Sequence, residues 1–386
     1  MEINHVRSRF IKHFDGKTGN IYVAPGRINL IGEHTDYNGG FVFPGAVDCG
    51  IMAELRPNGT DTVMCYAIDL KDRVEFNIND TEGPRTTWAR YIYGIVKEMQ
   101  ALGVDVRGFN TAFAGDVPLG AGMSSSAALE SCFAFALNDL FGDNKVSKWD
   151  MALAGQATEH KYIGCNCGIM DQFASVFGQA GKLMRLDCRS REFEYFPFNP
   201  EGYTLLLVNS CVKHELAGSP YNDRRRSCEN VVKAINAKYP ERNAETLRDC
   251  TWQDLEDVKD MVSSEDIQRA TFVLGEKDRM LAVCDALEHS DYEEVGKLMY
   301  LTHNGLSKDY EVSCEEIDFL NDIAKECGVS GSRIMGGGFG GCTINLVRNE
   351  LLENFINTVQ DKYYAKYGIK PKIHYVSISD GARKVV

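Results

Sequence analysis

Residues 118–128 read PLGAGMSSSAA, and the apolar runs that flank and overlap this stretch indicate the class of fold. Residues 109–114 form a short apolar run typical of a buried strand, and residues 126–140 form a longer apolar run typical of a buried helix. Gly120 and Gly122 allow the backbone to bend tightly between the two and to approach a ligand closely. The stretch therefore predicts a strand, a glycine loop and a helix in succession.

The start of this predicted helix is suited to an anion. A helix N-terminus offers unpaired N–H groups and the positive end of the helix dipole, and Ser124, Ser125 and Ser126 add three hydroxyls. The loop is not a Walker A motif, because no Gly-Lys-Ser/Thr follows, and Ser125 stands where a dinucleotide fingerprint has its third glycine. Two interpretations stay open on these residues alone: a phosphate-binding loop, or a helix cap whose small residues serve close packing.

A second glycine-bearing stretch, residues 26–40 (GRINLIGEHTDYNGG), concentrates charged side chains. It contains Glu33, His34 and Asp36, and carboxylates beside an imidazole can exchange hydrogen bonds with several hydroxyls, as a sugar requires. Arg27 can stabilise a phosphoryl group during its transfer or favour the ionised form of a neighbouring carboxylate. The alternative is a polar turn with a local ion pair.

A third stretch, residues 335–342 (MGGGFGGC), holds five glycines ahead of an apolar run. This density suits a loop whose backbone N–H groups line a ligand. A hairpin connection between two strands is the alternative interpretation.

Two acidic residues lie between the second and third motifs. Asp171 follows apolar residues, where a lone carboxylate is costly unless it is paired or functional, so it is a candidate base with Arg27 as its partner. Glu159 is a candidate ligand for Mg²⁺, which prefers one or two carboxylates together with phosphates and water. Either residue is otherwise an ordinary capping or surface carboxylate. The nearby run Cys165–Cys167 lacks the second pair of ligands that a four-coordinate metal site needs.

Beyond the motifs, both halves of the chain mix sheet and helix. Residues 41–78 alternate strand-like runs with turns, whereas residues 222–325 are mostly helical and begin with three arginines, Arg224–Arg226, which we expect to be solvated. Two prolines interrupt regular structure just before residue 201. The sequence therefore predicts an α+β protein of two domains, residues 1–200 and residues 201–386.

Composition narrows the choice of partners. The chain has 386 residues and a formal net charge of −13, so its long-range field repels nucleic acids and anionic membranes, while local groups can still bind a small phosphorylated molecule. No apolar run approaches the roughly 18 residues that span a bilayer, and the charged N-terminal residues are unlike a secretory signal. The 13 irregularly spaced cysteines fit reduced thiols. We expect a cytoplasmic monomer without a nucleic-acid or membrane partner.

Taken together, the motifs resemble those of the galactokinases, a family of the GHMP small-molecule kinase superfamily. Residues 26–44 (GRINLIGEHTDYNGGFVFP) resemble the family's galactose signature, residues 118–128 its phosphate-loop motif and residues 336–341 (GGGFGG) its third motif. The blocks GIMDQF (168–173) and SPYNDRRRSC (219–228) also match, and the matches run in family order over nearly the whole chain. The resemblance implies two α+β domains in a GHMP kinase-like fold, with the active site in the cleft between them.

The resemblance also implies an activity and the residues that carry it. The activity is ATP-dependent phosphorylation of the anomeric hydroxyl of D-galactose by direct in-line transfer, with galactose and ATP as small-molecule substrates and Mg²⁺ as cofactor. Asp171 would accept or orient the hydroxyl proton, and Arg27 would stabilise the charge on the γ-phosphoryl group and hold Asp171 ionised. Galactose would contact Glu33, His34, Thr35, Asp36, Gly168, Asp171 and Tyr221. ATP would contact Gly120, Ala121, Gly122, Met123, Ser124, Ser125, Ser126 and, near the adenine, Trp88, while Ser126 and Glu159 would hold the metal ion.

Two other activities stay open. A kinase for N-acetylgalactosamine or arabinose belongs to the same superfamily, although the N-acetylgalactosamine kinases depart from the run His34–Asn38 that this chain keeps. A non-catalytic sensor of galactose and ATP is a different class of protein. Such sensors lack part of the serine-alanine loop, whereas Ser126 and Ala127 are present here.

Overall fold

The computed structural model describes residues 2–118, 120–212 and 220–386. Leu119 of the phosphate-loop motif and Ser219 of the block 219–228 lie outside the described residues. Below, the N-terminal half means the residues up to 200 and the C-terminal half the residues after it.

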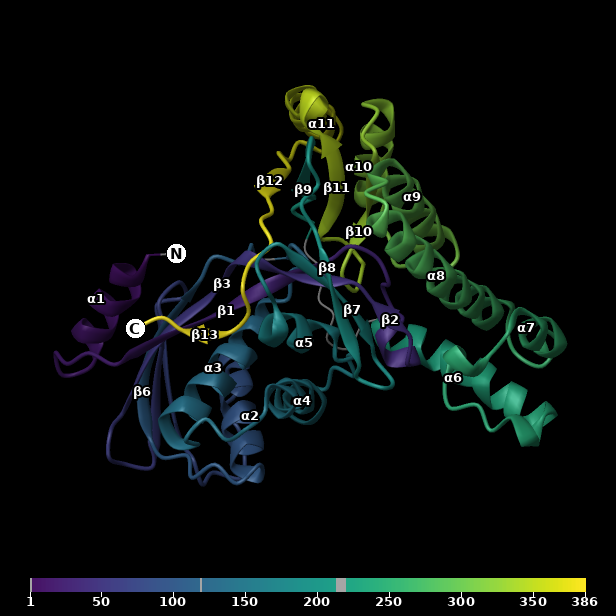
Figure 1. Cartoon of the computed structure of the whole chain (residues 1–386). Helices are drawn as coiled ribbons and strands as arrows, with labels where there is room; N and C mark the ends of the chain where they lie inside the picture. The colour runs from purple at the N-terminus through teal and green to yellow at the C-terminus, as the bar shows by residue number, and fades with distance from the viewer. Residues whose placement is uncertain (1, 119, 213–219) are drawn as a thin grey trace.

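A six-stranded sheet organises the N-terminal half, with helices on both of its faces (Figure 1). The elements of this half are α1 (Ile3–His13), β1 (Asn20–Asn29), the 3-10 helix η1 (Asp36–Asn38), β2 (Phe41–Val42), β3 (Pro44–Pro57), β4 (Thr62–Ala67), β5 (Asp72–Asn77), α2 (Thr87–Ala101), β6 (Phe109–Gly115), α3 (Ser125–Phe141), α4 (Lys148–Thr158), the π-helix η2 (Glu159–Ile163), α5 (Met170–Phe177), β7 (Lys182–Asp187) and β8 (Phe193–Pro197).

The order of strands in this sheet is β13-β1-β3-β6-β4-β5, and a small second sheet has the order β2-β7-β8. Helices α2 and α3 cover one face of the large sheet, where Tyr93, Phe109 and Phe133 are buried. Helix α1 covers the opposite face with Phe10 and Phe14. Because α3 leaves directly from the phosphate-loop motif, this packing fixes where that loop lies.

A four-stranded antiparallel sheet of order β10-β11-β9-β12 organises the C-terminal half, beside a group of long helices (Figure 1). Its elements are β9 (Tyr203–Asn209), α6 (Pro220–Lys238), η3 (Pro240–Arg242), η4 (Leu247–Asp249), α7 (Trp252–Val258), α8 (Ser264–Glu288), α9 (Tyr292–Lys308), α10 (Glu315–Glu326), β10 (Gly331–Met335), β11 (Cys342–Arg348), η5 (Asn349–Leu351), α11 (Leu352–Tyr367), β12 (Lys372–Tyr375) and β13 (Arg383–Lys384).

The two halves share one of the hydrophobic clusters. Ile28 and Phe43 of the N-terminal half are buried together with Leu207, Met299 and Ile344 of the C-terminal half. Burial of apolar surface is the main favourable term in such packing. The halves are therefore held against each other, and residues at the edge of this cluster keep fixed positions across the boundary.

The end of the chain returns to the N-terminal half. Strand β13 pairs antiparallel with β1 at Tyr22↔Lys384 and Val23↔Arg383, and Val47 forms a bridge with Ile378. Without this pairing β1 would be an edge strand with unpaired backbone groups. The predicted division at residue 200 remains a prediction, and the last residues pack with the half that precedes it.

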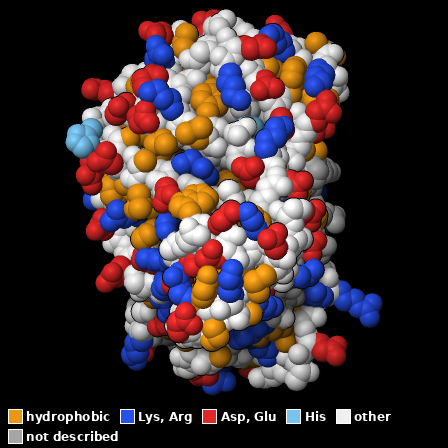
Figure 2. Space-filling view, turned by 90° about the vertical axis from the view of Figure 1, so that its right-hand side faces the viewer, with side chains coloured by type: hydrophobic (Ala, Val, Ile, Leu, Met, Phe, Trp, Pro, Cys, Tyr) orange, Lys and Arg blue, Asp and Glu red, His pale blue; other side chains and the backbone are white. Residues whose placement is uncertain are grey.

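The molecular surface seen in Figure 2 carries Lys, Arg, Asp and Glu side chains mixed with small groups of apolar ones. In the described part of the chain, every helix is too short or too polar to cross a membrane.

Candidate active site

A cavity of about 250 Å³ brings the sequence motifs together where the two halves meet. Its lining comes from the signature stretch, the phosphate loop, the segment around Asp171, and Tyr221 and Gly337 of the C-terminal half. The full lining is Arg27, Glu33, His34, Asp36, Val117, Pro118, Gly120, Ala121, Gly122, Met123, Ser124, Ser125, Ser126, Glu159, Cys165, Cys167, Gly168, Met170, Asp171, Gln172, Tyr221 and Gly337. Segments far apart in the sequence thus form one site.

An ion pair between Arg27 and Asp171 lies at the centre of this lining. Arg27, on β1, donates from Nε to Oδ1 of Asp171 at 2.8 Å and from Nη2 to Oδ2 at 2.9 Å, and its Nη1 donates to the carbonyl of Gly122. Burial alone would lower the pKa of Arg27, but the carboxylates of Asp171 and Glu33 outweigh it and raise the pKa. The side chain of Asp171 is 27% exposed, so a carboxylate fixed by a buried guanidinium faces the cavity. The structure contains the pair that the sequence predicts.

The strand carrying Arg27 continues beyond the point where the sequence suggests a stop. Pro25-Gly26 marks the end of a short strand by its composition, yet β1 runs on to Asn29 with an irregular register between Pro25 and Arg27. A Cβ atom on Gly26 would lie 2.7 Å from the carbonyl oxygen of Met123, and Arg27 N donates to that same oxygen at 3.0 Å. The glycine therefore allows the strand to touch the phosphate loop.

His34 presents an uncharged imidazole to the cavity. Its backbone has φ 61°, the ring is buried, and Nδ1 lies 2.8 Å from the hydroxyl of Tyr37. Burial, with a smaller effect of Arg224, lowers the pKa of His34 to about 3. Nε2 is buried without a hydrogen-bond partner among the described residues, so this nitrogen can pair with a ligand hydroxyl.

Asp36 lies directly over Gly168. A Cβ atom on Gly168 would stand 2.0 Å from Oδ2 of Asp36, so only glycine leaves room for this carboxylate. Burial, with the nearby charge of Asp171, raises the pKa of Asp36 to about 7, although Tyr37 N donates to its Oδ1 at 2.9 Å. A sugar hydroxyl can donate its hydrogen to the ionised carboxylate or accept one from the protonated form.

Glu33 is turned toward the boundary between the halves. Its Oε1 accepts from both Nη atoms of Arg333 at 3.2 Å and from Gly336 N at 2.9 Å. Arg333 is fully buried and also donates to the carbonyls of Leu30 at 2.8 Å and Ile334 at 2.6 Å. Sequence reasoning missed Arg333, because nothing in its local sequence shows that a buried arginine on β10 pairs across the boundary. The predicted contact of Glu33 with galactose stays a prediction.

The hydroxyl of Thr35 forms hydrogen bonds within the segment that carries Glu33 and Asp36. Its hydroxyl is 2.9 Å from the carbonyl oxygen of Gly32 and 2.5 Å from that of Phe41, and it is not one of the cavity residues. Its predicted contact with the sugar stays a prediction.

Aromatic side chains from both halves surround His34. The ring of Tyr221, on α6, lies 5.3 Å from the imidazole, and the hydroxyls of Tyr37 and Tyr310 are 2.8 Å apart. Tyr310 is fully buried and comes from the C-terminal half; sequence reasoning also missed it. These contacts place the predicted residue Tyr221 beside His34 and Tyr37, and its contact with the sugar stays a prediction.

The phosphate loop has the backbone that its glycines predict. Gly120 has φ 71° and Gly122 has φ 70°, both in the left-handed region that glycine tolerates. Helix α3 begins at Ser125, and Ser124 before it has φ 56° and forms no capping hydrogen bond through its side chain. The first N–H groups of the helix are therefore left for a ligand.

Two of the five glycines in residues 336–341, Gly336 and Gly341, closely approach the phosphate loop. A Cβ atom on Gly336 would lie 3.1 Å from the carbonyl oxygen of Gly122, and one on Gly341 would lie 3.0 Å from that of Gly120. From this loop, Gly337 lines the cavity. Close backbone contact, more than ligand binding, explains the glycine density.

Glu159 and Ser126 meet beside the phosphate loop. Glu159 begins the π-helix η2 and is 6% exposed. Burial raises the pKa of Glu159 to about 7, a hydrogen bond from Ser126 opposes this rise, and Asp171 adds to it. The described residues hold no group of three or more His, Cys, Asp or Glu side chains arranged for a metal ion. The pair supplies the hard oxygen ligands that Mg²⁺ uses together with phosphate and water.

For Trp88 and for Arg224, the structure shows contacts that the sequence does not predict. Trp88 is not one of the cavity residues: its indole N–H donates to Asp72 at 3.0 Å and its ring lies 5.4 Å from that of Phe113, so its contact with adenine stays a prediction. The expectation that Arg224–Arg226 is solvated is wrong for Arg224. This residue is buried and donates to the carbonyl of Tyr310 at 2.7 Å, because helix α6 turns it inward.

Comparison with protein families finds three matches along the chain. Residues 8–57 match the model described as the galactokinase galactose-binding signature. Residues 90–179 match the GHMP kinases N terminal domain, and residues 284–365 match the GHMP kinases C terminal domain.

Curated relatives and solved structures agree with these matches. A galactokinase of Clostridium beijerinckii is 38% identical over 389 residues, covering 99% of both chains, and one of Fusobacterium nucleatum is 39% identical over 94% of both. The crystal structure of Lactococcus lactis galactokinase complexed with galactose superposes with a TM-score of 0.92 at 31% identity, covering 98% of both chains. Mevalonate kinase of Methanococcus jannaschii shares the fold, with a TM-score of 0.68 at 19% identity over 95% of this chain and 99% of that one.

Proposed function

The chain belongs to the galactokinase family of GHMP kinases, and we propose that its site transfers the γ-phosphoryl group of ATP in line to the anomeric hydroxyl of galactose. It is an enzyme that phosphorylates galactose with ATP. The observation that carries the residue assignments is the bidentate pair between Arg27 and Asp171, which joins the signature stretch to the phosphate loop through Gly122.

Asp171 is the proposed base. Its carboxylate takes the proton of the anomeric hydroxyl while that oxygen bonds to the γ-phosphorus, and the bond from this phosphorus to the bridging oxygen of ADP breaks. Arg27 fixes both carboxylate oxygens, so the base cannot rotate away from the acceptor. Orientation of this kind can supply much of the rate enhancement in phosphoryl transfer.

The positive groups around the phosphate loop are proposed to bind and stabilise the transferred group. Arg27 and the uncapped N-terminus of α3 both face the cavity. Donors that are already in place need not reorganise as charge develops in the transition state. In this assignment the backbone from Gly120 to Ser126 binds the phosphates of ATP.

Ser126 and Glu159 are the proposed protein ligands of Mg²⁺. The bound ion would neutralise charge on the phosphates of ATP. Glu159 is a buried carboxylate whose pKa is raised to about 7, and a nearby cation would favour its ionised form. An ion bound by one carboxylate and one hydroxyl of the protein would keep water and phosphate as its other ligands.

The sugar is proposed to lie on the opposite side of Asp171. His34 offers its unpartnered Nε2, Asp36 offers a carboxylate above Gly168, and Tyr221 closes the space from the C-terminal half. Mixed donors and acceptors fixed in this way recognise hydroxyls and reject analogues that lack them.

A panel of sugars tests the proposed substrate and site of transfer. Release of ADP should be rapid with galactose and much slower with N-acetylgalactosamine and arabinose, and ³¹P NMR should show the phosphate on the anomeric carbon. Faster turnover of either rival sugar would reassign the substrate. Binding of galactose and ATP without release of ADP would make the chain a sensor.

The metal assignment is tested with Glu159→Gln. This variant should need a higher concentration of Mg²⁺ for half-maximal activity, since it loses a charged ligand. Glu98→Gln is the matched control, because Glu98 is also largely buried but pairs with Lys161 at 2.8 Å and is not part of the cavity lining. An equal change in both variants would contradict the assignment.

Two expectations outside the chemistry also stay proposals: that the protein is monomeric and that it acts in the cytoplasm. Light scattering at micromolar concentration would test the first. A mass near twice 43.1 kDa would overturn it.

A further inference from the structure

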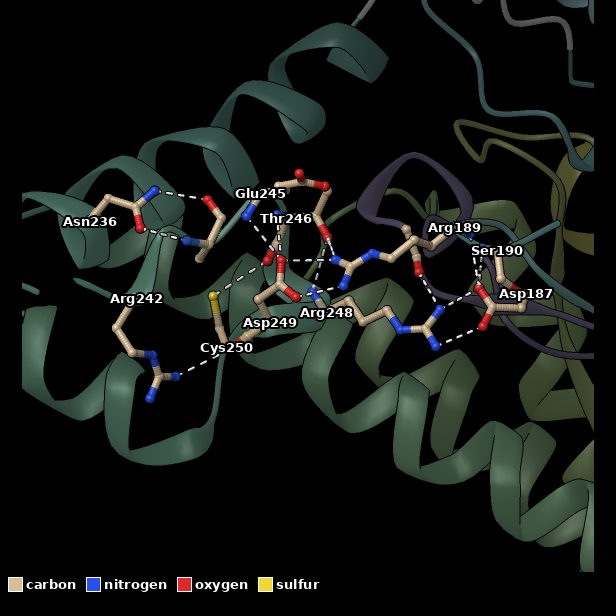
Figure 3. A network of polar contacts seen from close by, with 12 residues as sticks. Asp187, Arg189, Ser190, Asn236, Arg242, Glu245, Thr246, Arg248, Asp249 and Cys250 are labelled. Atoms are coloured by element: carbon tan, nitrogen blue, oxygen red, sulfur yellow. Dashed lines mark hydrogen bonds and ion pairs between the residues drawn. The ribbon is translucent and has the colours of Figure 1, made fainter. Parts of the chain in front are cut away.

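Two reciprocal ion pairs join the halves of the molecule (Figure 3). Arg248, in η4 of the C-terminal half, binds Asp187 at the end of β7, with Nη2 2.7 Å from Oδ2 and a second contact from Nη1 to Oδ1. Arg189, just after β7, binds Asp249 of η4 at 2.6 and 2.8 Å. Each half contributes one cation and one anion. These four residues are called the clasp below.

The clasp also touches the turn that carries Asp36. Arg248 Nη1 donates to the carbonyl of Gly39 at 2.9 Å, and its guanidinium lies 4.4 Å from the centre of the Phe41 ring. Gly39 ends η1 (Asp36–Asn38) with φ 65°, and Phe41 pairs with Asp187 in the small sheet. One arginine therefore contacts a backbone carbonyl and an aromatic ring directly after this turn.

The geometry of the clasp is more restricted than that of an ordinary surface pair. The side chains of Arg248 and Asp187 are 22% and 16% exposed and those of Arg189 and Asp249 are 36% and 28% exposed, whereas in the control pair on the β7–β8 hairpin Arg185 is 29% and Glu194 64% exposed. Both pairs of the clasp are bidentate, which fixes direction as well as distance. The carboxylate of Asp249 also accepts from the backbone N–H groups of Glu245 and Thr246, so it is held within its own turn.

The clasp spans the same boundary as the sugar side of the site. Asp36 and His34 come from the N-terminal half, whereas Tyr221 and Tyr310 come from the C-terminal half. The phosphate loop is held by a different set of contacts, with Met335 and Gly336. A change in the clasp should therefore weaken the binding of the sugar more than the binding of ATP.

We infer that Arg248 is a positioning residue for galactose: through Gly39, Phe41 and Asp187 it sets the place of the Asp36 turn against the aromatic side chains of the C-terminal half. This inference rests on the proposed function, because it takes Asp36 to contact the sugar. Arg248 acts through the turn and is not one of the residues lining the cavity.

The test compares Michaelis constants in clasp variants. Arg248→Ala should raise KM for galactose about tenfold, leave KM for ATP within about twofold, and change kcat less than KM for galactose. Arg248→Lys keeps the charge but loses the bidentate geometry, and should lie between wild type and Arg248→Ala. Arg189→Ala removes the other pair and should raise KM for galactose by a smaller factor.

Arg185→Ala is the matched control, because it removes an ion pair from the same hairpin without touching the turn. It should leave both KM values unchanged. Equal rises of KM for galactose and ATP in Arg248→Ala, or a lower melting temperature with unchanged KM values, would overturn the inference. If Arg248→Ala does not fold, Arg248→Lys and Arg189→Ala decide: unchanged KM for galactose in both would overturn it.

Asp36→Asn separates this inference from the proposed function. If Asp36→Asn raises KM for galactose and the Arg248 variants do not, the clasp inference alone fails. If Asp36→Asn leaves KM for galactose unchanged, the proposed sugar contacts fail, and the clasp inference fails with them.

Discussion

The two sides of the cavity are built from different parts of the polypeptide. On the sugar side, charged and aromatic side chains carry the geometry: Arg27 holds Asp171, Arg333 holds Glu33, and Tyr37 holds His34. On the phosphate side, the backbone sets the geometry of the site. It does so through two glycines with positive φ, an uncapped helix start and a second glycine loop packed against the first. A sugar presents many hydroxyls of different direction, whereas a phosphate presents equivalent oxygens that backbone N–H groups can meet.

The comparison teaches what each side can tolerate. Side-chain sites depend on charge and protonation, so isosteric changes should damage them. Backbone sites depend on dihedral angles and close approach, so the addition of a single methyl group should damage them.

The first prediction concerns Asp171, where the sugar side meets the phosphate side. Asp171→Asn keeps the size of the side chain but removes the proton acceptor, and should lower kcat about 10²- to 10⁴-fold with a much smaller change in KM for galactose. Steady-state kinetics measures both constants. Asp143→Asn, at an 82% exposed carboxylate paired with Lys145, should change neither. Unchanged turnover in Asp171→Asn would remove the base from the mechanism.

The second prediction removes the buried cation that supports the sugar side. Arg333→Met leaves Glu33 and several backbone carbonyls without their buried donor, and should lower the free energy of unfolding by about 3–5 kcal/mol. Urea unfolding measures the loss. Arg348→Met, at a 43% exposed residue on the neighbouring strand, should cost at most about 1 kcal/mol. Similar losses of unfolding free energy in the two variants would show that burial does not increase the contribution of the Arg333 contacts to stability.

The third prediction addresses the backbone of the phosphate side. Gly120→Ala and Gly122→Ala both place a side chain at positive φ, which costs about 1–2 kcal/mol. The added methyl meets nothing within 4 Å at Gly120 but stands 2.8 Å from the carbonyl oxygen of Met335 at Gly122. Gly122→Ala should therefore raise KM for ATP more and melt at a lower temperature. The reverse order would mean that the contact between the loops is unimportant.

The fourth prediction uses the titration of Asp36. Its pKa is raised from 3.8 to about 7 in the folded chain, so the folded state binds the proton more tightly between these values. Stability falls as the pH rises through this window, and the penalty is complete above about pH 7. Asp36→Asn should therefore stabilise the sugar-free chain by about 2–3 kcal/mol more at pH 8 than at pH 5, since about two pKa units lie between pH 5 and the folded pKa and each corresponds to about 1.4 kcal/mol.

Urea unfolding at the two pH values measures this difference. A stabilisation that is equal at both would show that the carboxylate is not buried in its charged form. Saturating galactose should reduce the difference, because a ligand that contacts the carboxylate replaces the lost solvent.

Much of the fold could be predicted from local pattern. The strand before the phosphate loop and the helix after it follow from apolar runs, and the observed β6 and α3 match them within one residue at each end. The mostly helical stretch predicted for residues 222–325 corresponds to α6 to α10, as the same pattern indicates. The pairing of β13 with β1 could not be predicted, because two residues at the chain end carry no periodic signal.

The candidate site was predictable where residues stand in one motif, and not where partners meet through folding. The pairing of Arg27 with Asp171 could be predicted because a charge buried among apolar residues is costly without a partner of opposite charge. Arg333, Tyr310 and Arg248 carry no local signature of their contacts across the boundary. These contacts are with Leu30, Tyr37 and Gly39, each more than 200 residues away in the sequence. Their roles come from the packing of the halves.

The sequence by itself determined the class of fold, the two glycine loops and the candidate base and cation, because backbone preference and the cost of burying charge act locally. Only the packing of the halves turns Glu33 to the boundary, brings Gly336 and Gly341 against the phosphate loop, and lets Arg248 reach the Asp36 turn. The physical reason is distance along the chain: a hydrogen bond of 2.9 Å between Gly39 and Arg248 exists only after two hydrophobic halves have buried their common surface.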